Sequence, residues 1–185
     1  MGWLIVLAVI IVLATSFVGI YNRLVGSNIK VNAAWSDIDV QLKRRYDLIG
    51  NLVETVKGYA SHEKSVFEEV TKARSVAMGA GNPVARAEAE GGLTATLKTL
   101  FAVAENYPEL KANQNFLSLQ DDLEETENKI ESARRYYNGT VRDFNTTREV
   151  FPNTLVTSLF SGKFPKREMF EVERPEEREA VKVEF

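Results

Sequence analysis

The pattern of apolar positions separates an N-terminal span from a longer helical region. From Trp3 to Ile20, eighteen consecutive residues carry no charge. At about 1.5 Å of rise per residue, a helix of this length covers roughly 27 Å, close to the hydrocarbon thickness of a bilayer. Trp3 and Tyr21 lie at its two ends, where aromatic rings favour the headgroup level. The pattern predicts one membrane-spanning helix.

A second apolar pattern follows, over residues 31–77. Apolar positions recur at alternating spacings of four and three residues, and only Arg45 and Glu63 interrupt them. Because the spacing keeps its register across Gly50 and Gly58, it favours one long helix of about 70 Å, kinked at most at these glycines. A turn at Gly50 would instead divide the same residues into two antiparallel helices.

Turn residues predict where this helix ends and the next begins. In the segment 79–83, glycine is expected to terminate the long helix, Asn82 is a good N-cap and Pro83 suits the first helical position. The next helix is predicted to extend to about Asn106. It contains the pair Gly91-Gly92, where we expect close packing against another helix.

Proline marks two further boundaries, and the elements together predict the fold. Tyr107-Pro108 precedes a third helix with an apolar stripe from Ala112 to Phe144, and Phe151-Pro152 precedes a short apolar stretch expected to form a terminal helical turn. Short connections favour antiparallel neighbours. The prediction is an all-α chain: an N-terminal transmembrane helix, an up-and-down antiparallel helical bundle with a long first helix, and an extended charged C-terminal tail. These parts cover residues 1–22, 23–160 and 161–185.

Charge and composition narrow the class of protein. A net charge of −3 over 185 residues argues against a nucleic-acid partner, and the absence of cysteine excludes lipoprotein attachment and disulfides. No basic residue precedes the span and no clean cleavage site follows it, which favours an uncleaved anchor over a signal peptide. Arg23 and Lys30, followed by the basic run 43–45, place the soluble region in the cytoplasm and the N-terminus outside.

Candidate catalytic chemistry is sparse. His62 is the single histidine, and a di-iron site would need Glu-x-x-His pairs, whereas Tyr59 occupies the position three before it. The adjacent carboxylates are expected on solvated faces, because neighbouring residues of a helix do not face each other; they are Glu68-Glu69, Asp121-Asp122 and Glu124-Glu125. We therefore predict no catalytic, cofactor-binding or metal-ligating residue and no enzymatic activity.

Two kinds of polar position have alternative interpretations. Arg45 and Glu63 lie on the apolar pattern, so each is either a side chain that reaches out at the edge of the core or a charge that specifies helix register or a partner. The Asn-x-Thr sequons at Asn138 and Asn145 fall in a predicted helix and are interpreted as coincidental.

Several stretches resemble the LemA family. The clearest are NAAWSDIDVQLKRR at 32–45 and AENYPELKAN at 104–113; shorter ones lie at 21–25, 47–53, 56–63 and 133–138. The similarity covers essentially the whole chain. One departure is Gly50, where the family usually has proline, which would favour a kink.

The resemblance implies a bacterial, inner-membrane, single-pass helical-bundle protein without established enzymatic activity. Family relatives in magnetosome-forming bacteria are linked to membrane remodelling, and neighbouring genes often encode membrane metallopeptidases. The leading hypothesis is a scaffold that associates with itself in the lipid bilayer, forming a homo-oligomer through the segment 50–59. Candidate contacts with subunits or partners are Trp35, Asp37, Asp39, Gln41 and residues 43–45; alternatively Trp35 is a core residue and the rest are solvated.

Two other functions are considered. In the first, the chain is an adaptor or regulator of a membrane-bound protease, such as a membrane metallopeptidase, with the charged tail as its docking element. Its last residues, Val183-Glu184-Phe185, have the apolar-x-apolar carboxylate pattern that PDZ-type grooves bind. Alternatively the tail folds back on the bundle, where the alternating Val181, Val183 and Phe185 would add a strand or lie in a groove. In the second, it is a membrane-bound hydrolase that uses His62 with Glu63 or Glu69, although zinc sites usually need two or more His or Cys ligands.

Overall fold

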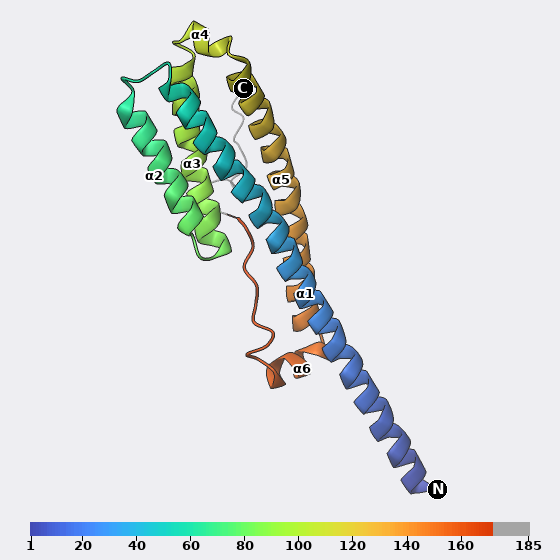
Figure 1. Cartoon of the computed structure of the whole chain (residues 1–185). Coiled ribbons are helices and arrows are strands. Elements are labelled where there is room, and N and C mark those ends of the chain that lie inside the picture. Colours follow the sequence, from blue (N-terminus) through green and yellow to red (C-terminus); the bar gives the residue numbers. More distant parts are fainter. Residues whose placement is uncertain (172–185) are drawn as a thin grey trace, which may run out of the picture. The chain divides into compact units, whose positions relative to one another are not determined.

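The computed structural model describes residues 1–171, which form six helices and no strand (Figure 1). The helices are α1 (Gly2–Lys57), α2 (Lys64–Gly79), α3 (Pro83–Ala104), α4 (Pro108–Lys111), α5 (Gln114–Glu149) and α6 (Asn153–Leu159). The predicted all-α class with a long apolar first helix is confirmed. The chain divides into two compact units: unit 1 holds residues 1–44 and 125–169, and unit 2 holds residues 45–124 with Phe170 and Glu171 among the described residues.

Unit 1 is built on an antiparallel pair made by α1 and the second part of α5. The ring of Trp35 lies 5.3 Å from that of Tyr137, centroid to centroid. Nine residues further along α1, Arg44 lies 3.7 Å from Glu125, which comes earlier in α5. Residues later in α1 therefore contact residues earlier in α5, so the two helices are antiparallel. Apolar side chains of both helices fill the interface; the buried ones include Leu24, Val31, Ala34, Ile38, Leu42, Ile130, Val141 and Phe144.

The first part of α1 has the composition of a membrane span. Its best window of 18 residues has a mean hydropathy of 2.8, and none of that window is buried in the protein. A core helix of such composition would cover its apolar side chains with other elements. By length and composition α1 can cross a bilayer.

Unit 2 packs the last turns of α1 with α2, α3 and the beginning of α5, and within it α2 and α3 lie side by side (Figure 1). Arg74 of α2 approaches Asp47 of α1 at 3.9 Å. The rings of Phe101 and Phe116 bring the end of α3 to the start of α5, with centroids 6.4 Å apart. The buried apolar residues include Ile49, Leu52, Val56, Phe67, Val70, Leu93, Leu97 and Leu100.

Gly50 and Gly58 differ in their effect on the long helix. α1 continues through Gly50, as preferred from the sequence, but it ends at Lys57 just before Gly58. The amides of Tyr59 and Ala60 donate to the carbonyl of Val56 at 3.0 and 2.9 Å, which turns the chain. The prediction of one helix as far as residue 77 is therefore wrong. The apolar spacing persists because two successive helices bury their seams in the same core.

The start of α3 is confirmed, whereas the explanation for its glycine pair is wrong. Asn82 is the N-cap, and its Oδ1 accepts from the amide of Ala85 at 2.8 Å. Gly91 and Gly92 are exposed, and an added Cβ would meet no neighbouring atom within 4 Å. Among residues 1–171, no helix packs closely against them.

The third predicted helix is interrupted near its start. The short α4 follows Tyr107-Pro108, and α5 begins only after Asn113. The Oδ1 of Asn113 accepts from the amides of Asn115 and Phe116 at 2.9 and 3.1 Å, the arrangement of a helix N-cap. The sequence analysis did not recognise this cap.

The end of the described chain agrees with the prediction of a terminal helical turn followed by an extended segment. The turn is α6, and residues 163–171 contain no helix or strand. The predicted alternation of Val181, Val183 and Phe185 lies outside the described residues.

Candidate functional site

A buried charged cluster lies inside unit 2. Arg45 is only 4% exposed. Its Nη1 donates to Oε2 of Glu90 at 2.6 Å, and its Nη2 donates to the hydroxyl of Thr94 at 2.9 Å. The hydroxyl of Tyr46 donates to the other oxygen of the Glu90 carboxylate. The cluster thus joins the last turns of α1 to α3.

The electrostatics of this cluster favour a structural role. Burial, followed by the hydrogen bond to the Glu90 carboxylate, raises the pKa of Tyr46 above its ordinary value. Glu90 is itself buried, and both of its oxygens accept hydrogen bonds from named donors. Arg45 is therefore not a side chain reaching out at the core edge. Its pairing matches the alternative interpretation, a charge that specifies how two helices are aligned.

Glu63 and His62 do not belong to this cluster; they lie at the start of α2. Glu63 is the N-cap residue of α2, is partly exposed, and makes no side-chain capping bond. His62 is exposed in the turn before α2, and Glu69 is exposed on α2. Across the described residues, no three His, Cys, Asp or Glu side chains gather where they could hold a metal ion.

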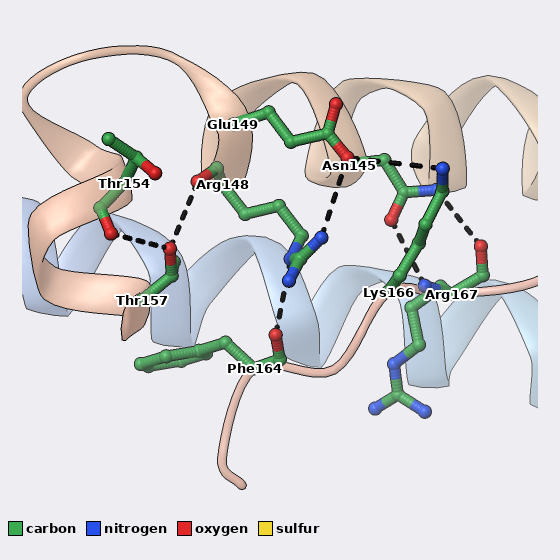
Figure 2. A network of polar contacts seen from close by, with 8 residues as sticks. All are labelled: Asn145, Arg148, Glu149, Thr154, Thr157, Phe164, Lys166 and Arg167. Atoms are coloured by element: carbon green, nitrogen blue, oxygen red, sulfur yellow. Dashed lines mark hydrogen bonds and ion pairs between the residues drawn. The ribbon is translucent and has the colours of Figure 1, made fainter. Parts of the chain in front are cut away.

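In unit 1 a polar network attaches the segment after α6 to α5. Figure 2 shows Asn145 using both ends of its amide: Nδ2 donates to the carbonyl of Arg167 at 2.9 Å, and Oδ1 accepts from the Arg167 amide at 3.0 Å. The Nε of Arg148 donates to the carbonyl of Phe164 at 3.2 Å. Side chains of α5 thereby satisfy the backbone carbonyls of Phe164 and Arg167 and the backbone amide of Arg167.

The same segment also reaches α1. The Nη2 of Arg167 donates to Oδ1 of Asn28 at 2.8 Å and to Oδ1 of Asn32 at 3.2 Å. The hydroxyl of Tyr137 donates to the carbonyl of Glu168 at 2.8 Å, and burial raises the pKa of Tyr137. None of these roles was predicted, because each joins residues far apart in the sequence.

The sequon asparagines have structural surroundings. Asn138 is buried, and the amide of Asn145 is occupied by the backbone of Arg167. Both agree with the interpretation that the sequons are coincidental.

Residues proposed as subunit or partner contacts fall into different environments. Trp35 is partly buried against Tyr137, as the core alternative expects for this residue, and Arg45 is buried as described. Asp37, Asp39, Lys43 and Arg44 are exposed.

An open hollow of about 590 Å³ lies between α1 and α5 in unit 1. Val40 is 64% exposed at its wall. Lys129 donates to Oε1 of Glu125 at 2.6 Å, and this hydrogen bond lowers the pKa of the Glu125 carboxyl. The complete lining is Asp37, Val40, Gln41, Glu125, Asn128, Lys129, Ser132 and Ala133. The hollow combines apolar and charged walls and is wide enough to accept a side chain from outside.

Comparison with known proteins identifies the family. The LemA family model matches residues 34–185. Magnetosome protein MamQ 2 of Paramagnetospirillum magneticum is 27% identical over 196 residues, covering 92% of this chain and 71% of that protein. Protein LemA of Metamycoplasma hominis is 25% identical over 134 residues, covering 70% of this chain and 60% of that protein. None of these relatives is named for an enzymatic activity. Since the family model spans most of the sequence, the chain belongs to the LemA family.

Proposed function

We propose that this chain is a non-enzymatic scaffold, anchored in the bacterial inner membrane by α1, whose copies associate along the exposed face of that helix. The observation that carries the proposal is an uncovered apolar face on α1. Ile29 and Val40 are 60% and 64% exposed, although both are large apolar residues. Eleven residues apart on a helix, they lie on the same side. The face differs from the one that α1 buries in unit 1, which carries Val31 and Ile38.

The residues around Ile29 and Val40 suit close helix contact. Ala33 and Ser36 lie between them, small and exposed, at the alternating four and three spacing of a packing seam. Toward the membrane, the same spacing reaches Gly26 and Gly19, and an added Cβ at either glycine would meet no neighbouring atom within 4 Å. Small residues let helix backbones approach one another within a bilayer. A neighbouring α1 can therefore follow this face from the span to Val40, both within unit 1.

The segment 50–59, expected from the sequence to form the interface, is less suitable. An added Cβ at Gly50 would lie 3.6 Å from the guanidinium carbon of Arg74, so this side of α1 already faces α2. Leu52, Val53 and Val56 are buried. We therefore assign the contact between copies to the Ile29–Val40 face, with the hollow beside Val40 available to a neighbour's side chain.

The likeness to magnetosome proteins supports a role in organising membranes. A scaffold of this kind presents one surface many times, which requires no catalytic residue. The basic residues after the span, Arg23 and Lys30, favour an orientation with the N-terminus outside and both units in the cytoplasm.

Sedimentation velocity of the purified protein tests the association. In mild detergent at micromolar concentration, we expect an oligomer for the unmodified chain and at least roughly tenfold weaker association for Ile29→Asp and Val40→Asp. The matched control is Val76→Asp, which alters an exposed apolar residue of α2 (56% exposed) and should leave the oligomer intact. Circular dichroism verifies that each variant is folded.

Two results would contradict the proposal. If the unmodified chain is strictly monomeric both in detergent and in lipid nanodiscs, the chain is not a self-associating scaffold. An oligomer that persists unchanged in the Ile29→Asp and Val40→Asp variants removes the α1 face as its interface.

A further inference from the structure

Unit 1 exposes an apolar stripe at α6. Phe151, Leu155 and Leu159 are 77%, 61% and 70% exposed. They follow one another at intervals of four residues, so the two leucines lie on one face of α6. Phe151 lies two residues before the helix begins and continues the same spacing. The opposite face of α6 is buried and carries Asn153, Val156 and Thr157. The helix thus turns its more apolar face away from the protein.

Hydrogen bonds fix this orientation of α6. The Nδ2 of Asn153 donates to the carbonyl of Thr147 at 2.7 Å, and the hydroxyl of Thr157 donates to the carbonyl of Arg148 at 3.1 Å. Figure 2 shows Thr157 directed at the end of α5 in this way. Rotating α6 to bury its leucines would break both contacts, so the exposed stripe is a fixed feature of unit 1.

The position of α6 along α1 indicates what covers the stripe. Phe160, directly after α6, packs against Phe17 and Tyr21, with ring centroids 6.3 and 5.3 Å apart. Phe17 belongs to the charge-free run of α1, and Tyr21 is the first residue after that run. α6 therefore lies level with the end of the span, where the hydrocarbon of a bilayer gives way to headgroups.

Charged residues near α6 suit the headgroup region. Lys163 donates to the hydroxyl of Tyr21, and its Nζ lies 5.0 Å from the centre of that ring. Lys166 is exposed and lies 4.0 Å from the Glu149 carboxylate, and Arg23 is exposed two residues after Tyr21 on α1. Lysine and arginine beside an apolar stripe are typical of segments that lie in a membrane interface with anionic lipids.

We propose that α6 is a second membrane contact, in which Phe151, Leu155 and Leu159 enter the lipid interface at the level where α1 leaves the bilayer. This inference rests on the membrane anchoring proposed above, and it goes beyond it because an anchor needs only α1. Two contacts hold α1 against rotation about its own axis, which keeps its Ile29–Val40 face in a fixed direction along the membrane plane.

Fluorescence quenching by lipids tests the contact. The chain contains no cysteine, so single cysteines can be introduced at Leu155 or Leu159 and labelled with an environment-sensitive dye. The protein is reconstituted in nanodiscs that contain anionic lipid, with or without bromine on the acyl chains. Val9 on the span, 52% exposed, is the positive control, and Val76 on α2, 56% exposed, is the matched apolar control.

We expect the labels at Leu155, Leu159 and Val9 to emit at shorter wavelength and to lose at least about half of their intensity with brominated lipid. The label at Val76 should keep its intensity. Quenching at Val9 without quenching at Leu155 and Leu159 overturns the α6 contact and leaves the anchor standing. A blue-shifted but unquenched α6 label means that protein covers the stripe, which also overturns the proposal. An unquenched Val9 label overturns the anchor and the α6 contact with it.

Discussion

At the scale of single residues, the interior of unit 2 tolerates two opposite charges because each satisfies the other. Arg45 and Glu90 are 4% and 6% exposed, and their charged atoms approach to 2.6 Å. Removing either partner leaves an ion in a poorly solvating interior, which costs more than the intact pair contributes. Any misalignment of α1 and α3 that separates the pair therefore costs a large free energy, because it leaves both charges buried and unpaired.

We predict that Glu90→Ala lowers the free energy of unfolding by about 3–5 kcal/mol, because it leaves Arg45 buried without its carboxylate. The triple substitution Arg45→Met, Tyr46→Phe and Glu90→Leu should recover most of that loss, since it replaces both charges with apolar volume and removes the Tyr46 hydroxyl that Glu90 accepts from. Denaturant titration of the detergent-solubilised full chain measures both.

Glu54→Ala is the control for this prediction. Glu54 pairs with Lys57 at 2.7 Å on the exposed side of the same helix, so its loss should cost at most about 1 kcal/mol. A Glu90→Ala variant no less stable than Glu54→Ala would contradict a dominant role for the buried pair.

At the scale of elements, the glycines of this chain have distinct effects. Gly50 lies inside a continuous α1, and an added Cβ there would lie 3.6 Å from the guanidinium carbon of Arg74, an ordinary van der Waals contact. Gly58 starts the turn that ends the same helix, and an added Cβ there would meet the carbonyl oxygen of Thr55 at 3.3 Å. Gly91 lies on the exposed face of α3 with open space around it. Residue type alone does not distinguish these three environments.

Alanine substitutions should separate two of these environments. Gly91→Ala is expected to raise the free energy of unfolding by about 1 kcal/mol, because alanine has the higher helix propensity and its methyl group meets nothing. Gly58→Ala should give no such gain, because an added Cβ there would lie 3.3 Å from the carbonyl oxygen of Thr55, closer than ordinary van der Waals contact, and Gly58 lies outside the helix. Thermal and denaturant unfolding measure both, and destabilisation by Gly91→Ala would show that α3 needs its glycine.

At the scale of the whole molecule, one uninterrupted helix connects the apolar span with the packed part of unit 1. Cleavage within residues 15–19, as a signal peptidase would do, cuts α1 where Phe17 packs against Phe160. The structure of unit 1 thus includes the end of the span, which agrees with a retained anchor.

We therefore predict that the protein extracted from membranes keeps its N-terminal span. Intact-mass spectrometry should find a species whose mass includes the whole run from Trp3 to Ile20. A dominant species that begins between Thr15 and Gly19 would identify the run as a cleaved signal and contradict the anchor.

The sequence by itself determined the all-α class, the candidate span, the start of α3 at Asn82-Pro83 and the family. These features depend on local signals: an unbroken apolar run, helical spacing, and caps that act within three or four residues. The resemblance to the LemA family came from contiguous motifs, which the family match over residues 34–185 then supported.

Only the tertiary structure decided which distant residues meet. Arg45 pairs with Glu90, and Arg167 bonds to Asn28, and in each pair the two residues are separated by turns in the chain. The outward face of α6 likewise depends on how that helix packs against the rest of unit 1. The end of α1 at Lys57 was hidden for a related reason, because two antiparallel helices that share one core can keep the same apolar spacing across the turn between them. Periodicity reports which side chains are buried along each helix, whereas the packing of helices against one another selects their partners.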